Sequence, residues 1–153
     1  MPLTLAALKE QLSSIEVDGA TYDGIGPSDV PLLEQLVRDP ETWLAARAIF
    51  ALSQLRSAAA TAILAGSAAD PRPEIRVAVA ASAKNLPAED ASGILLQALN
   101  DPELGVRKFA IRSVAPQHAA SVQAKLRELE AGDPAPSLRD AAGAKLSQIR
   151  REP

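Results

Sequence analysis

The dipeptide Asp-Pro recurs along this chain at almost constant intervals. The four copies are Asp39-Pro40, Asp70-Pro71, Asp101-Pro102 and Asp133-Pro134. Successive aspartates are 31, 31 and 32 residues apart. A fixed period of roughly 20 to 50 residues is typical of proteins built from stacked structural repeats, in which each repeat contacts only its neighbours. This spacing therefore predicts a solenoid of about four units.

Each unit is predicted to be a pair of helices. Apolar residues stand five, nine and thirteen places after each aspartate, at steps of four that follow one face of a helix. These positions hold Leu44, Ile75, Val106 and Leu138, then Ala48, Val79, Ala110 and Ala142, then Leu52, Ala83, Val114 and Leu146. Apolar residues also precede the aspartates, which predicts a helix A before each turn and a helix B after it. The aspartate is expected to be the N-cap of helix B.

The composition supports helices with an interior of small and branched side chains. Aromatic residues make up 3% of the chain although hydrophobic residues make up 47%. Alanine is abundant and has the highest helix propensity of all residues. The predicted fold is all-α: an α-solenoid of about four helical pairs with an extra N-terminal helix, in a single domain spanning 1–153. The predicted segments are a helix at 3–15, a loop at 16–28, and repeats at about 29–57, 58–87, 88–117 and 118–151.

Charge and cysteine content exclude several classes of function. The formal net charge is −3, so no overall positive field would attract nucleic acid or an anionic membrane. The chain has no cysteine, which excludes disulfides, thiolate zinc sites and thiol nucleophiles. The first ten residues lack the basic region of a secretory signal, and no stretch approaches the roughly 18 apolar residues of a membrane span. We therefore expect a cytoplasmic protein that binds neither nucleic acid nor membranes.

The pattern Asp-Pro-x-x-x-(Val/Ile/Leu)-Arg-x-x-Ala, clearest at 70–79 and 101–110, resembles HEAT repeats. The short period is similar to that of the bacterial subtype related to phycobilisome lyase subunits, and the resemblance covers about residues 29–150. It implies that the turn aspartate and the helix B arginine six places later form a ladder linking neighbouring units. The implied ladder residues are Asp70, Arg76, Asp101, Arg107, Asp133 and Arg139. The first repeat has Ala45 in the arginine position, so the resemblance identifies no ladder arginine for this repeat.

Catalytic and metal-binding chemistry is not expected. His118 is the only histidine, and without other ligands at suitable spacing we interpret it as an ordinary surface residue. A DNA glycosylase built on helical repeats would need a basic face with aromatic residues to hold an extruded base. This acidic chain has one Trp and one Tyr. We therefore predict that the protein is not an enzyme and has no catalytic residues, no metal and no cofactor.

The resemblance implies that helix B lines the concave side of the stack, where positions off the core stripe are available to a partner. These positions carry Trp43, Phe50, Val77, Lys84, Lys108 and Arg112. We hypothesise a non-catalytic interaction module or scaffold that binds a protein partner there, as a monomer or weak oligomer. Alternatively, Trp43 and Phe50 only cover the seam with the N-terminal helix and the loop that carries Tyr22. An alternative function is a lyase-like or chaperone-like subunit acting on a protein that bears a cofactor or chromophore.

Overall fold

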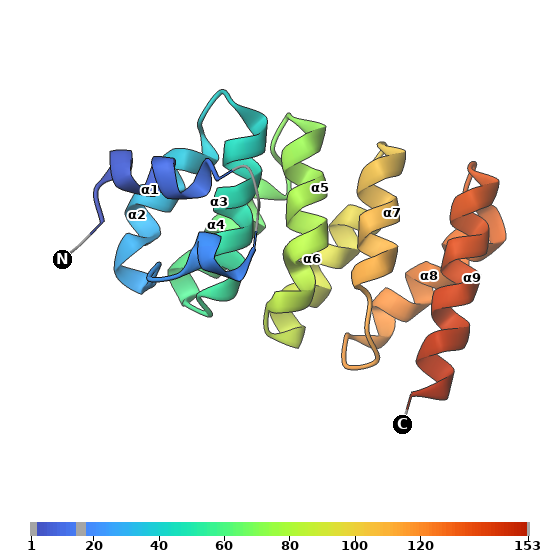
Figure 1. The fold of residues 1–153 in the computed structure, drawn as a ribbon. Coiled ribbons are helices and arrows are strands. Elements are labelled where there is room, and N and C mark those ends of the chain that lie inside the picture. The colour runs from blue at the N-terminus through green and yellow to red at the C-terminus, as the bar shows by residue number, and fades with distance from the viewer. Residues whose placement is uncertain (1–2, 15–17, 153) are drawn as a thin grey trace.

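A computed structural model describes residues 3–14 and 18–152 of the chain. Within these residues it holds nine α-helices, three short 3-10 helices and no strand. The predicted all-α solenoid of about four helical pairs with an extra N-terminal helix is confirmed (Figure 1). Of the predicted N-terminal helix and loop, Ile15, Glu16 and Val17 lie outside the described residues.

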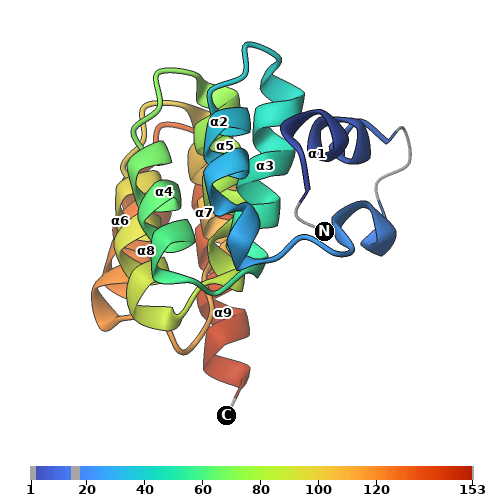
Figure 2. The same ribbon diagram turned by 90° about the vertical axis from the view of Figure 1, so that its left-hand side faces the viewer.

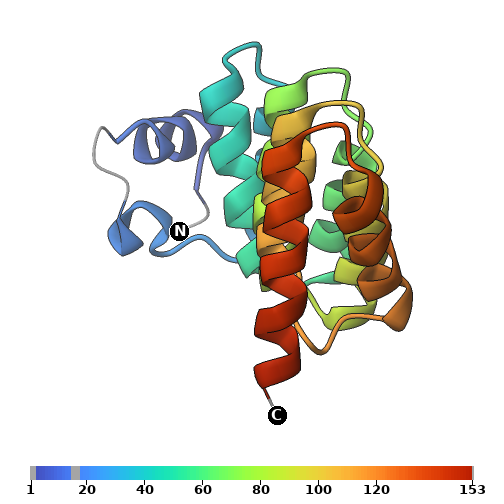
Figure 3. The same cartoon turned by 90° about the vertical axis from the view of Figure 1, so that its right-hand side faces the viewer.

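The helices form two layers. Layer A consists of α2 (Val30–Val37), α4 (Ala58–Ser67), α6 (Ala88–Leu99) and α8 (Ala120–Gly132). Layer B consists of α3 (Thr42–Gln54), α5 (Pro73–Ser82), α7 (Leu104–Ser113) and α9 (Pro136–Arg151), and the short η3 (Ala83–Asn85) follows α5. Helix α1 (Leu5–Leu12) and the short η1 (Gly19–Tyr22) and η2 (Pro27–Asp29) precede the array. Figures 2 and 3 show α1 and η1 on the side of α3 that is remote from layer A.

The core between the layers is built as the composition predicts. Among the described residues, every buried apolar side chain is Ala, Leu, Ile or Val. The predicted helix B stripe is buried in all four repeats, from Leu44 to Leu146. Burial of one such Leu, Ile or Val side chain contributes roughly 1.5–3 kcal/mol. In α1 the stripe is only partly buried, because Leu8 and Leu12 are inside whereas Leu5 is 37% exposed.

The turn aspartates lie three residues before the first residue of helix B. The prediction that they are the N-caps of helix B is therefore wrong. In each turn the Asp Oδ1 accepts from the main-chain N–H two residues later, at 2.9 Å in all four copies. Helix B begins one residue after that N–H. The aspartate therefore forms an Asx turn, because the proline that follows it disfavours helical backbone at the aspartate itself. Pro73 and Pro136 are the first residues of α5 and α9, where the missing N–H leaves no bond unmade.

The arginines of helix B join consecutive turns. Arg76 Nη1 donates to the main-chain oxygen of Asp70 at 2.9 Å, while its Nε and Nη2 donate to the Asp101 carboxylate at 2.7 and 3.2 Å. Arg107 repeats this arrangement with the Asp101 main chain at 3.0 Å and the Asp133 carboxylate at 2.9 and 3.2 Å. Each arginine thus binds the main chain of its own turn and the carboxylate of the next. Such two-pronged, charge-assisted hydrogen bonds are among the strong ones in proteins.

The paired carboxylates are nearly buried. The side chains of Asp101 and Asp133 are 7% and 1% exposed. Burial raises the pKa of each carboxyl, but the arginine and main-chain N–H donors outweigh it, so each pKa lies below its usual value. At the last turn Arg139 donates to the main-chain oxygen of Asp133 at 2.7 Å. The sequence has no fifth Asp-Pro turn to receive it.

The first rung is made by an arginine that the repeat alignment does not identify. The arginine position of the first repeat holds Ala45, which is fully buried. Arg72 reaches back from the second turn instead, donating to the main-chain oxygens of Asp39 at 2.8 Å and Val37 at 2.7 Å. Its Nε and Nη2 also bind the Asp70 carboxylate, each at 3.0 Å. The guanidinium of Arg72 therefore links the main chain of one turn to the carboxylate of the next, as in the other rungs.

The N-terminal helix supplies a cation to the first turn. Lys9 Nζ on α1 lies 3.1 Å from Asp39 Oδ2. The pKa of Asp39 is lowered, first by the main-chain N–H of Glu41 and then by Lys9. Because the lysine side chain is 47% exposed, solvent screens this pair and its contribution to stability is small. Helix α1 thus stands where a preceding repeat would present its arginine.

Substitution of Arg107 tests the ladder. Arg107→Ala removes the cation and two hydrogen bonds from the buried Asp133 carboxylate, so the free energy of unfolding should fall by roughly 1–3 kcal/mol. Arg139→Ala, which removes a hydrogen bond to the main-chain oxygen of Asp133, should lower it less. Because the folded-state pKa of Asp133 is lowered, the stabilisation is present above the usual carboxyl pKa of about 4 and is lost as the pH falls below it. Urea unfolding from pH 7 downward measures both effects. Equal losses for the two variants would contradict the assignment.

A compensating pair tests the replacement of the first rung. Arg72→Ala should destabilise the protein by an amount similar to Arg107→Ala, because the Asp70 carboxylate loses its partner. Adding Ala45→Arg to that variant places a guanidinium at the position that Arg76 and Arg107 hold in later repeats. We expect this double variant to recover part of the loss in urea unfolding. In the wild-type background the same Ala45→Arg change should destabilise, since Ala45 is fully buried and Arg72 already binds Asp39 and Asp70. Additive losses in the double variant would contradict the idea that the two positions serve one rung.

Candidate functional site

The six residues predicted to bind a partner lie along layer B. Trp43 and Phe50 are on α3, Val77 is on α5, Lys84 is on η3, and Lys108 and Arg112 are on α7. We call the surface formed by these six residues the helix-B face. Trp43 is 45% exposed, the three cationic side chains are exposed, and Phe50 and Val77 are half-buried. The six ladder residues belong to the turns or bind them, and none is part of this face.

The N-terminal part of the chain covers one end of the helix-B face. The rings of Tyr22 and Phe50 are 4.9 Å apart between centroids and tilted by 58°. Arg47, which also lies on α3, donates from Nη1 to the main-chain oxygens of Leu12 and Ser14, the latter at 2.6 Å. Burial raises the pKa of Tyr22, and the nearby Arg47 opposes this shift. Phe50 therefore packs at the seam with the loop that carries Tyr22.

Trp43 lies at the exposed edge of this seam. The guanidinium carbon of Arg47 is 5.1 Å from the centroid of the Trp43 ring, within the range of a cation–π contact. Nearly half of the tryptophan surface nevertheless remains open to solvent. The two aromatic residues of α3 therefore differ: Phe50 packs against the N-terminal loop, and Trp43 is available for contact with another molecule.

Beyond this seam, the face is basic. The ion pairs found among the described residues involve none of Lys84, Lys108 and Arg112. The guanidinium carbon of Arg112 lies 5.2 Å from the centroid of the Phe109 ring. Lys145 of α9 donates to the main-chain oxygen of Arg112 at 3.0 Å, and burial lowers its pKa. Sequence reasoning missed Phe109, although its position three residues before Arg112 on a helix places the two side chains together.

Around α3, α5 and α7, the acidic residues lie toward the opposite ends of the helices. Glu74 is in the first turn of α5, and Glu41 and Glu103 directly precede α3 and α7. Arg112 is in the last turn of α7 and Lys84 follows α5. This distribution also compensates the helix dipoles, so charge alone does not identify a binding site. The exposed Trp43 has no such explanation.

His118 is buried, so the prediction of a surface residue is wrong. Its side chain is 4% exposed, and Nδ1 accepts a hydrogen bond from the main-chain N–H of Ala115 at 2.9 Å. Burial lowers the pKa of the imidazole. The histidine thus closes the turn between α7 and α8. Sequence reasoning considered only its lack of metal-binding neighbours and not this local capping role.

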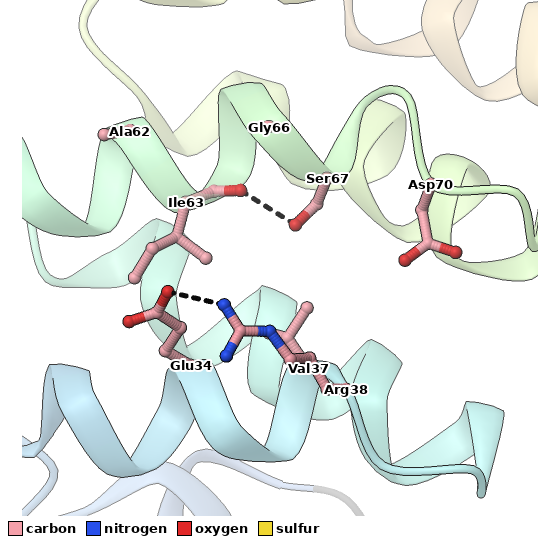
Figure 4. Close-up of a pocket in the computed structure, with 8 residues that line it drawn as sticks. All are labelled: Glu34, Val37, Arg38, Ala62, Ile63, Gly66, Ser67 and Asp70. Atoms are coloured by element: carbon pink, nitrogen blue, oxygen red, sulfur yellow. Dashed lines mark hydrogen bonds and ion pairs between the residues drawn. The ribbon is translucent and has the colours of Figure 1, made fainter.

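Two hollows in the surface do not provide a second candidate. One of about 440 Å³ lies between α2 and α4 (Figure 4). Its polar groups are already paired, since Arg38 binds Glu34 at 3.0 Å and Ser67 Oγ donates to the Ile63 main-chain oxygen at 2.8 Å. A hollow of about 360 Å³ beside Tyr22 and Phe50 belongs to the seam described above.

The part of the chain that the structure describes contains no group of three or more His, Cys, Asp or Glu side chains placed to hold a metal ion. No helix in this part is long and apolar enough to cross a membrane.

Comparison with known proteins agrees with the architecture. Residues 30–113 match HEAT repeats. The fold is similar to a solved structure of the complex of CpcE and CpcF of phycocyanin lyase from Nostoc sp. PCC7120, with a TM-score of 0.68 and 21% sequence identity over 93% of this chain and 99% of that one. No curated protein matches the sequence. At this identity the structural similarity establishes the fold.

Substitution of Arg47 tests how the N-terminal part is held. Arg47→Ala removes the hydrogen bonds to Leu12 and Ser14, so α1 should open more often while the repeats stay folded. We expect faster hydrogen exchange of the α1 amides, with little change in α5 to α9. Arg112→Ala, which removes an arginine from another helix of layer B, is the matched control and should leave the exchange of the α1 amides unchanged. If both variants behave alike, Arg47 does not anchor this segment.

Proposed function

Because the chain belongs to the family of HEAT-repeat proteins, we propose that it is a non-catalytic interaction module that binds a protein partner on the helix-B face. The exposure of Trp43 carries this proposal. It is the only tryptophan of the chain, yet it is 45% exposed and contributes to neither the buried core nor the ladder. Binding energy at protein interfaces is concentrated in Trp, Tyr and Arg side chains.

The residues that stabilise the stack differ from the exposed residues of the helix-B face, and this supports the same proposal. Repeat stacks are stabilised by contacts within each unit and between neighbours. Here the buried Ala, Leu, Ile and Val residues and the turn arginines supply those contacts. The exposed side chains of α5 and α7 are therefore free to vary without loss of the fold. Lys84, Lys108 and Arg112 would favour a partner with acidic groups beside an apolar side chain that meets Trp43.

Paired substitutions on the two layers test the proposal. The partner is first captured from cells of the source with the tagged chain, then purified for titration. Trp43→Ala and Arg112→Glu should each weaken its binding by about tenfold or more, while the melting temperature changes little. Arg127→Glu makes the same charge change on the exposed surface of α8 in layer A and should leave binding intact. Binding that survives both helix-B substitutions, or that Arg127→Glu weakens equally, contradicts the proposed face. Unfolding caused by Trp43→Ala would remove the tryptophan as an anchor.

The likeness to the phycocyanin lyase complex supports a second candidate. The match spans 93% of this chain and 99% of the other, so a lyase-like or chaperone-like subunit that acts with another subunit on a chromophore-bearing protein has the same architecture. In that case the chain would be part of a catalytic assembly. A purified tetrapyrrole whose absorption spectrum changes on mixing with the chain favours this candidate. An unchanged spectrum, together with partner binding through Trp43, favours the interaction module.

A further inference from the structure

The chain itself shows one way in which layer B holds the end of a helix. Arg47 donates to the main-chain oxygens of Leu12 and Ser14, at the carboxyl-terminal end of α1. The last carbonyls of a helix have no partner within the helix and carry the negative end of its dipole. Three residues along α3, Phe50 packs on the ring of Tyr22, which follows α1 in the chain. One arginine and one aromatic side chain thus bind a helix end and the segment after it.

The same pair of residue types recurs on α7 at the equivalent positions. Arg47 and Phe50 stand eight and eleven places after the first turn aspartate, whereas Phe109 and Arg112 stand eight and eleven places after the third. The order is exchanged, but the two side chains lie together, with 5.2 Å between the Arg112 guanidinium carbon and the ring centroid. The Arg112 side chain is exposed, in contrast to the half-buried Arg47.

Small residues occupy the positions equivalent to Phe109 and Arg112 on the two neighbouring helices of layer B. The equivalent positions are Ala78 and Ala81 on α5, and Ala141 and Ala144 on α9. Helices α5 and α9 both pack against α7, so small side chains flank the arginine and the ring on both sides. In the described structure, α1 contacts α2 and α3 but is not among the elements packed on α7. The pair on α7 therefore lies between two alanine surfaces that a helix can approach closely.

The charges around this pair favour a negative ligand. Lys108 is on α7 itself, Lys84 is on η3, which packs against α7, and Lys145 of α9 binds the Arg112 main chain. Helix α7 contains no acidic residue. The acidic residues of the helices packed on α7 are Glu74 in the first turn of α5, Glu89 and Asp90 in the first turn of α6 and Asp140 in the first half of α9. Glu152, which follows α9, interacts with Lys145. Within layer B, the cations near the last turn of α7 therefore outnumber the carboxylates.

From these observations we infer that Phe109 and Arg112 form a docking site for the carboxyl-terminal end of an acidic helix of a partner protein, followed by an aromatic residue. This inference rests on the proposed function and specifies its partner. Arg112 would donate to the last carbonyls of that helix as Arg47 does to α1, and the aromatic residue would pack on Phe109. The surrounding lysines would attract the acidic side chains of the helix.

A peptide from the chain itself is a suitable probe. Residues 3–25 combine the α1 sequence with Tyr22 and contain one lysine and four carboxylates, giving a net charge of −3. A labelled, end-capped peptide of this sequence is titrated with the full-length chain by fluorescence anisotropy at physiological salt, where the Debye length of about 8 Å screens distant charges. A scrambled peptide of the same composition has the same charge without the amphipathic helix.

We expect the peptide to bind the wild-type chain. Arg112→Glu and Phe109→Leu should each weaken peptide binding by about tenfold or more, whereas Arg127→Glu should leave the affinity unchanged. The scrambled peptide should bind less tightly. Phe109→Leu keeps an apolar side chain, so the fold is retained. Absence of binding up to about 1 mM peptide, equal effects of Arg112→Glu and Arg127→Glu, or equal binding of the scrambled peptide would overturn the inference. So would binding that depends on Arg47 but not on Arg112, because the peptide would then only exchange with α1.

Two further observations separate this inference from the proposed function. If the captured partner depends on Trp43 and Arg112 but the peptide does not bind, the interaction module stands and the helix-end site is wrong. If sedimentation shows that the chain dimerises with increasing concentration and that Arg112→Glu abolishes the dimer, the occupant is a second copy, which also overturns the inference. A chain that stays monomeric while binding the peptide supports a separate partner.

Discussion

The aspartate of each turn performs two tasks on which the stack depends. Its Oδ1 accepts from the main chain two residues later and so shapes the entry to helix B. In the second to fourth turns, the same carboxylate also receives the guanidinium that spans to the preceding turn. A single side chain thereby fixes the direction of its own helix and the position of that helix relative to its neighbour. This coupling keeps equivalent positions of α3, α5, α7 and α9 at the same level along the stack.

Because of this alignment, residues at equivalent positions of the four layer B helices can be compared with one another. Positions eight and eleven after the aspartate hold Arg and Phe on α3, two alanines on α5, Phe and Arg on α7, and two alanines on α9. None of these residues is fully buried, although Ala78, Phe109 and Ala141 are half-buried and pack against the core. Alanine at both positions of α5 and of α9 shows that the stack does not require large side chains there. On α3 the large side chains Arg47 and Phe50 bind the N-terminal part of the chain.

The sequence predicts the features that recur in every repeat, but it does not predict the interactions that occur in only one of them. The helical pairs, the all-α class and the buried stripe follow from the 31-residue spacing and hold in every repeat. The rung through Arg72 could not be predicted, because the arginine comes from the next turn and from outside the repeated arginine position. His118 is similar, since its partner is a main-chain N–H exposed by a local turn. The position of Phe50 depended on how the loop with Tyr22 folds back, which no repeat pattern encodes.

The two ends of the array differ in a way that bears on binding. Repeat proteins need atypical terminal units because an inner repeat would expose its apolar side. At the C-terminal end, α9 presents polar residues such as Asp140 and Arg150 to solvent. At the N-terminal end, α1 covers α3 and brings Lys9 to the first turn. This cover occupies the part of layer B that carries Arg47 and Phe50. The proposed partner surface consequently begins at the exposed Trp43 and continues over α5, η3 and α7, where Lys84, Lys108 and Arg112 are exposed.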